Sequence, residues 1–227
     1  MDGLLLVKKP KEWTSFDVVA KVRGIARKAT GQKKVKVGHA GTLDPLATGL
    51  LLVLVGSYCK RASEFSKLDK CYEVTMEFGK TSTTDDEEGE KTFVSDMQPA
   101  DDRVKATLQS FVGSIEQRPP IYSAIKVDGE RAYKSARQGQ EVTLKPRIVT
   151  IHSITDVTYN YPKLSFTTNV SSGTYIRSLA RDIGNKLGTG AYLKELNRKS
   201  VGQYLLNDAI SVDAINEDNI QTKLLQV

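Results

Sequence analysis

The sequence contains few of the residues that disulfide scaffolds, metal centres and membrane spans require. Its 227 residues include only two cysteines, Cys59 and Cys71, and two histidines, His39 and His152. Two cysteines make no disulfide framework, and the four residues do not have the spacing of a zinc motif. The longest purely aliphatic run, residues 50–55, is too short to cross a bilayer. We therefore expect no metal and no membrane span, and we expect a reducing compartment, the cytoplasm.

Charge of one sign is in excess, and it is unevenly distributed. The formal net charge is +6, and positions 1–40 hold ten basic and three acidic residues. Positions 81–104 reverse this balance, with eight acidic and two basic residues. Clustered lysine and arginine bind polyanions because they release the counterions of phosphate groups. The pattern is compatible with a nucleic-acid partner, and equally with an ordinary solvated surface.

Hydrophobic periodicity indicates strands and helices that alternate along one large domain. Strands are predicted at residues 3–7, 35–38, 50–55, 71–78, 148–154 and 164–170. Helices are predicted from a cap near Thr14 to a stop at Gly31, over 57–68 and 101–112, and from Ile176 to Gly188. The acidic stretch 81–90 is predicted to be an exposed loop. A mixed α/β or α+β sheet protein fits this order.

The first candidate for a functional site is a polar loop between two predicted strands. Residues 38–49, GHAGTLDPLATG, combine a histidine, a carboxylate and three glycines. Loops of this kind often carry chemistry, which makes Asp44 a candidate catalytic residue. Alternatively, Asp44 caps a helix that begins at Pro45, a pairing that requires no catalysis.

The second candidate is the polar segment before the last long helix. Residues 171–177, SSGTYIR, precede that helix, and the N-terminus of a helix favours anions. Arg177 and Arg181 are four residues apart and share a helix face. They either serve a site or are surface charges that Asp182 and solvent satisfy.

Residues 122–146 form a basic segment with interleaved tyrosines. Its charged residues are Lys126, Arg131, Lys134, Arg137 and Lys145, and a turn is predicted at residues 128–129. We interpret it as a basic arm, with a solvated hairpin as the alternative.

Together these segments match the sequence motifs of one protein family, in the same order along the chain. The chain resembles the TruB-type tRNA pseudouridine synthases from Leu4 to about Tyr204. The motifs are residues 38–49, 70–72 (KCY), 122–126 (YSAIK) and 173–177 (GTYIR), and the first and last are highly specific. The resemblance implies an α+β pseudouridine synthase fold. Such a fold has a mixed, mainly antiparallel sheet flanked by helices, with an RNA-clasping insertion here at about 120–147.

The resemblance also implies roles for individual residues. Asp44 matches the family's nucleophilic carboxylate, Arg177 the arginine that pairs with it, and Tyr72 the tyrosine that stacks on the target base and helps to remove the C5 proton. Further positions that match or are expected to bind substrate are His39, Lys70, Lys126, Arg137, Tyr175 and Leu196. An aspartate is ionised at neutral pH because its usual pKa is about 3.9. Isomerisation requires no cofactor, so none is expected. Without the family, Tyr72 would be read as a half-buried strand aromatic, and Tyr175 and Leu196 as core residues.

Domain organisation and partners follow from the same resemblance. Residues 1–207 correspond to the catalytic domain and 208–227 to a short tail, without the family's usual C-terminal RNA-binding domain. Asn197 stands where many relatives have an arginine, and Arg198 is the candidate to replace that phosphate contact. The implied substrate is the T arm of tRNA, bound by a monomer with no guide RNA, since guide-dependent relatives lack the insertion. The alternatives are a tRNA-folding chaperone, or the same chemistry on T-loop-like hairpins of other RNAs.

Overall fold

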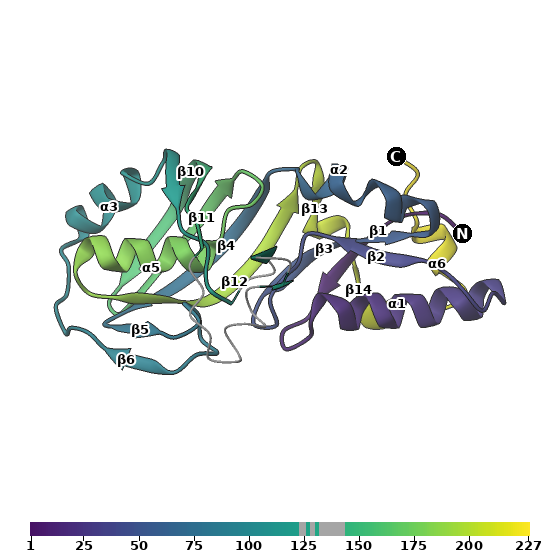
Figure 1. The fold of residues 1–227 in the computed structure, drawn as a ribbon, viewed down its shortest axis with the longest axis horizontal. Helices are drawn as coiled ribbons and strands as arrows, with labels where there is room; N and C mark the ends of the chain where they lie inside the picture. The colour runs from purple at the N-terminus through teal and green to yellow at the C-terminus, as the bar shows by residue number, and fades with distance from the viewer. Residues whose placement is uncertain (123–125, 128–129, 132–143) are drawn as a thin grey trace. The chain divides into compact units, whose positions relative to one another are not determined.

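The computed structural model describes residues 1–122, 126–127, 130–131 and 144–227. These residues belong to two compact units (Figure 1). Unit 1 consists of Met1–Tyr72 and Leu196–Val227, and unit 2 lies within Glu73–Glu195. Two strands, β4 (Lys70–Phe78) and β12 (Ala191–Val201), contribute residues to both units.

Unit 1 is built on a sheet whose strand order is β14-β1-β3-β12. Its other strands are β1 (Gly3–Lys9), β2 (Val37–Ala40), β3 (Thr48–Val55), β13 (Tyr204–Leu205) and β14 (Ile210–Ser211). Strand β3 pairs antiparallel with β1 and β2 and parallel with β12, while β14 pairs parallel with β1. The predicted strand at 35–38 is thus displaced by two residues at each end, because the register with β3 begins at Val37.

Both faces of the β1–β3 strands are covered, which explains their unbroken aliphatic sequences. Successive side chains point to opposite faces of a sheet. Leu4 and Leu6 pack on one face with Phe65 of α2 (Ala62–Ser66), which follows the 3-10 helix η1 (Gly56–Arg61). Figure 1 shows α1 (Ser15–Thr30) on the opposite side of these strands from α2.

The ends of α1 agree with the prediction. Thr14 caps the helix through a capping box with Asp17, and Gly31 closes it in the left-handed conformation. The prediction of one helix over 57–68 is wrong, because the 3-10 helix η1 occupies its first half and the α-helix α2 ends at Ser66. The amide of Leu68 donates to the carbonyl of Phe65, three residues earlier, which is the spacing of a 3-10 helix and not of an α-helix.

The segment 208–227 packs onto unit 1. It contains the short 3-10 helix η3 (Val212–Ala214) and α6 (Ile220–Lys223), and η2 (Leu206–Asp208) leads into it. Leu225 exchanges two backbone hydrogen bonds with Leu4, at 2.8 and 3.0 Å. These contacts fix the segment to the first strand of the chain.

Unit 2 has the strand order β12-β4-β11-β10-β7. Its further strands are β5 (Lys80–Ser82), β6 (Lys91–Phe93), β7 (Gly113–Gln117), β8 (Lys126–Val127), β9 (Glu130–Arg131), β10 (Arg147–Asn160) and β11 (Lys163–Val170). Strand β10 pairs antiparallel with β7 and β11, while β5–β6 and β8–β9 are separate hairpins. The turn predicted at 128–129 lies outside the described residues.

Two helices, α3 (Asp101–Gln109) and α5 (Ile176–Leu187), pack against each other on the unit 2 sheet (Figure 1). The predicted apolar face of α5 is buried, and Gly188 ends the helix in the left-handed conformation, as expected. Pairing is mixed in unit 1 and antiparallel between β10 and its two neighbours in unit 2, with helices alongside in both, so the α+β class is confirmed.

Candidate active site

Asp44 lies in the turn that joins β2 to β3. The amide of Ala47 donates a hydrogen bond of 3.0 Å to the carbonyl of Asp44, and β3 begins one residue later. The half-buried Asp44 therefore starts a tight turn that leads into a strand. The alternative in which Asp44 caps a helix beginning at Pro45 is wrong.

The residues on either side of Asp44 are held by side chains from the start of the chain. The hydroxyl of buried Ser15 donates to the carbonyl of Leu43 at 3.0 Å and accepts from its amide at 2.9 Å. The carbonyl of Pro45 accepts from the amide of Glu12 at 2.8 Å and from the Lys9 ammonium at 3.3 Å. Both neighbours of Asp44 are thus fixed to the segment around the beginning of α1.

Arg198 of β12 holds the outer parts of the same loop. Its Nε donates to the carbonyl of Leu50 at 2.7 Å, and its Nη2 donates to that of Gly41 at 3.1 Å. A longer contact of 3.5 Å joins Nη1 to the carbonyl of Thr42. The side chain is buried, with only 1 % of the residue exposed. The expectation that Arg198 replaces a phosphate contact is therefore wrong, because its donors point into the protein.

His39 lies on β2 and is half-buried. Its ring meets that of Phe16 edge-on, with 5.4 Å between centroids. Burial, and secondly the positive charge of Arg198, lower the pKa of His39. The imidazole is therefore neutral at neutral pH.

Three other predicted residues of unit 1 are buried. Tyr72 lies on β4 and Leu196 on β12, where the Leu196 carbonyl accepts a hydrogen bond from Thr48. Lys70 begins β4, and its ammonium donates to the carbonyls of Ser66, at 2.7 Å, and Leu68. Burial, and secondly the charge of Arg198, lower the pKa of Lys70 to about 8. Their roles toward substrate stay predictions.

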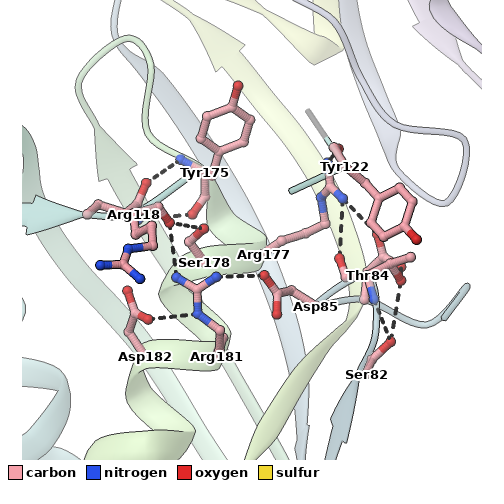
Figure 2. A network of polar contacts seen from close by, with 12 residues as sticks. Ser82, Thr84, Asp85, Arg118, Tyr122, Tyr175, Arg177, Ser178, Arg181 and Asp182 are labelled. Atoms are coloured by element: carbon pink, nitrogen blue, oxygen red, sulfur yellow. Dashed lines mark hydrogen bonds and ion pairs between the residues drawn. The ribbon is translucent and has the colours of Figure 1, made fainter. Parts of the chain in front are cut away.

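In unit 2, Arg177 lies in the first turn of α5 and is directed into the protein (Figure 2). It donates to the carbonyls of Tyr122, at 3.0 Å, and Thr84, at 3.3 Å. Its Nη1 also lies 3.4 Å from a carboxylate oxygen of Asp86, and both side chains are buried. The alternative of a surface charge is wrong for Arg177.

Arg181, one turn further along α5, joins three segments of unit 2 (Figure 2). It pairs with Asp85 at 2.8 Å and with Asp182 at 3.0 Å, and donates to the carbonyl of Arg118 at 3.0 Å. Burial raises the pKa of Asp85, and the charge of Arg181 opposes the rise. Asp182 thus pairs with Arg181, as the surface-charge alternative expected, but Asp85 does so as well.

The prediction that 81–90 is an exposed loop is wrong at its centre. Asp86 is buried and Asp85 is half-buried, and the two arginines of α5 supply the charges that make this burial tolerable. Sequence reasoning missed both acidic residues. The available signal was the pairing of a dense acidic run with two arginines on one helix face, but nothing in the sequence specified that they meet.

Tyr175 immediately precedes α5, and its backbone is held by a buried amide. The side chain of Gln117 accepts from the Tyr175 amide at 2.8 Å and donates to its carbonyl at 3.1 Å. The guanidinium of Arg147 lies over the half-buried ring, 4.8 Å from its centroid. The ring is thus held in one orientation at the start of the helix that carries Arg177.

The predicted site residues are therefore distributed over both units. Unit 1 holds Asp44, His39, Lys70, Tyr72 and Leu196, and unit 2 holds Tyr175 and Arg177. Lys126 belongs to β8, while Arg137 and most of the basic arm lie outside the described residues. Within the described ranges, no cluster of three His, Cys, Asp or Glu side chains suits a metal ion. In the same ranges no helix is long and apolar enough to span a membrane.

Comparison with solved structures places this fold. The chain is similar to one in a Cbf5-Nop10-Gar1 complex, with a TM-score of 0.67 and 26% identity over 93% of this chain and 54% of that one. A chain from an H/ACA RNP bound to a substrate RNA containing 2′-deoxyuridine also gives a TM-score of 0.67, at 24% identity. The protein spans about half the length of these solved chains.

Comparison of sequences gives the class and then the family. Residues 27–176 match the model for the N-terminal domain of TruB family pseudouridylate synthases, and residues 177–226 match the C-terminal domain of tRNA pseudouridylate synthase B. The protein is thus a pseudouridine synthase, as predicted. The tRNA pseudouridine synthase B of Chlorobaculum tepidum is 45% identical over 94% of this chain and 89% of its own length. That of Phocaeicola vulgatus is 44% identical over 94% and 92%. The chain belongs to the TruB family.

Proposed function

We propose that this enzyme converts a uridine in the T arm of tRNA to pseudouridine, with the carboxylate of Asp44 as nucleophile. The observation that supports the proposal is the placement of Asp44 in a turn held on both sides by Ser15 and Lys9, in a chain whose relatives are tRNA pseudouridine synthases. A nucleophile that is already oriented loses little entropy when it attacks.

The proposed chemistry is an isomerisation that balances without any other reactant. Asp44 attacks the substrate as the bond between N1 of uracil and C1′ of ribose breaks. The detached base turns, and its C5 bonds to C1′ while the bond between Asp44 and the substrate breaks, which restores the free carboxylate. The C5 proton then leaves and N1 gains a proton. In this scheme Tyr72 stacks on the base and takes part in proton removal. Arg177 orients the nucleophile, a role that suits a planar guanidinium better than an ammonium.

The proposal includes a cytoplasmic monomer that requires no guide RNA and binds tRNA through positive charge. The basic N-terminal region supports this, although its first helix has fewer free charges than the sequence implies. Lys21 pairs with Asp213 at 2.5 Å, and Lys28 pairs with Glu217 at 3.1 Å. The exposed lysines of this region, with Arg27 of α1 and the basic arm, are then the main candidates to neutralise phosphates. The exposed lysines are Lys8, Lys11, Lys33, Lys34 and Lys36.

The test is pseudouridine mapping on a T-arm RNA incubated with wild type, Asp44→Asn and the control Asp96→Asn. Asp96 is an exposed carboxylate in unit 2. Wild type and the control should modify the T-loop uridine. Asp44→Asn should lower the rate at least about 1,000-fold, because a neutral amide is a poor nucleophile. RNA affinity and Tm should change little.

Two other outcomes have distinct meanings. An Asp44→Asn enzyme that makes pseudouridine at the wild-type rate would remove Asp44 from the chemistry. If this variant is inactive but fully rescues cells that lack the protein, the chaperone function is favoured. Mapping total RNA from the same cells would reveal modified hairpins outside tRNA.

A further inference from the structure

Phe16 is a large apolar side chain that unit 1 leaves in solvent next to the candidate active-site loop. It is the second residue of α1, and 62 % of it is exposed. Single exposed apolar residues are common and have no meaning by themselves. Phe16 differs because its ring packs edge-on against His39, at 5.4 Å and an interplanar angle of 86°. His39 is a residue that the family resemblance assigns to substrate contact.

Hydrogen bonds on both sides of Phe16 hold its backbone and link it to the Asp44 turn. Thr14 and Asp17 close the capping box on either side of it. Ser15, the preceding residue, makes both of its hydrogen bonds to Leu43, which immediately precedes Asp44. An exposed ring fixed in this way can stack on a ligand with little loss of conformational entropy.

His39 supports an aromatic rather than an ionic contact here. Burial and the charge of Arg198 lower its pKa, so the ring is neutral at neutral pH. Its Nδ1 is buried and has no hydrogen-bond partner among the described residues. Two uncharged rings of different chemistry therefore meet at right angles, and both belong to the segment 1–40, which holds ten basic and three acidic residues.

We propose that Phe16 is a further RNA-binding residue, which stacks on an unpaired nucleobase next to the one that His39 contacts. A nucleobase fits because it presents an aromatic face and is joined to phosphates that the basic residues of the segment 1–40 attract. The proposal rests on the proposed function, since it requires the RNA to enter at the Asp44 loop. Stacking of one base on an aromatic side chain changes affinity by about 5- to 150-fold.

The experiment compares wild type, Phe16→Ala, Phe16→Trp and Phe93→Ala, with KM and kcat measured for pseudouridine formation on a T-arm RNA. Phe93 is a matched control, because it is 67 % exposed and lies in unit 2. We expect Phe16→Ala to raise KM by about 5- to 150-fold with kcat within about twofold, because stacking contributes to binding and not to bond breaking. Phe16→Trp and Phe93→Ala should keep KM within about threefold of wild type.

The outcomes separate this inference from the proposed function. If wild type forms no pseudouridine in the T-arm RNA, the proposed function fails. If wild type is active and Phe16→Ala has the KM of Phe93→Ala, only the role of Phe16 is refuted. If Phe16→Ala lowers both Tm and kcat, stacking is also refuted, since Phe16 would then stabilise the fold. Recovery of KM by tryptophan, together with an unchanged Tm, supports stacking.

Discussion

Replacing Arg198 by methionine would remove the guanidinium that holds the carbonyls on both sides of the Asp44 turn. The two short bonds, of 2.7 and 3.1 Å, account for most of its contribution, and the contact at 3.5 Å adds little. A buried carbonyl that loses its partner costs about 1–3 kcal/mol, so the two together cost about 2–6 kcal/mol. Methionine also removes a charge that is expensive to bury, which offsets part of this loss.

We therefore expect Arg198→Met to lower the free energy of unfolding by about 2–4 kcal/mol. In a chain of this size that corresponds to a fall in Tm of about 5–15 °C. The same variant should lower kcat about 10- to 100-fold in folded enzyme, because a displacement of about 1 Å at a reacting group has effects of this size. KM should change less than kcat, since Arg198 is buried.

The assay is thermal unfolding followed by pseudouridine formation at a temperature where every variant is folded. Arg198→Lys keeps the charge but lacks the planar fork that reaches separate carbonyls, so it should be intermediate in both measurements. Lys8→Met, an exposed basic residue on β1, is the control for loss of charge. An Arg198→Met enzyme with wild-type Tm and wild-type kcat would refute the reasoning.

Two further predictions concern the surroundings of the same loop. Gly49 has φ 107°, and a Cβ there would lie 2.4 Å from the carbonyl oxygen of Arg198. Gly49→Ala should thus destabilise by about 3–5 kcal/mol in chemical denaturation, whereas Gly24→Ala, in open space on α1, should stabilise by up to about 1 kcal/mol. The pKa of Lys70 is lowered to about 8 in the fold, so the unfolded chain binds more protons between pH 8 and its ordinary value of 10.5. Wild type should gain stability relative to Lys70→Met as pH rises through this window, by at most about 3 kcal/mol, and a difference that stays flat with pH would contradict it.

The sequence predicted those parts of the fold that depend on neighbouring residues. The caps of α1 at Thr14 and Gly31 are local signals, and the aliphatic run of β3 specifies a strand covered on both faces. Failures occurred where distant residues decide the outcome. Asp85 is half-buried and pairs with Arg181, 96 residues further along the chain, and no local pattern encodes that pairing.

In the candidate site, too, local motifs were predictable from the sequence and contacts between distant residues were not. Recognition of the motif located Asp44, but its turn depends on Arg198, whose carbonyl partner at Leu50 is 148 residues away. From the sequence, Arg198 was interpreted as the replacement for a phosphate contact, because Asn197 stands where many relatives have an arginine. Burial of such a residue follows from strand pairing between β3 and β12, which periodicity alone does not give.

The two hydrogen bonds between Leu4 and Leu225 join a strand that is synthesised early to residues that are synthesised more than 200 positions later. Unit 2 lies within one continuous stretch, Glu73–Glu195, whereas unit 1 requires both the first strand and the last residues of the chain. Domains fold as units during synthesis, and synthesis proceeds at about 5–20 residues per second. Unit 2 can therefore form while the nascent chain is still attached, but β1 must wait for Leu225 to emerge before Leu4 has its hydrogen-bond partner.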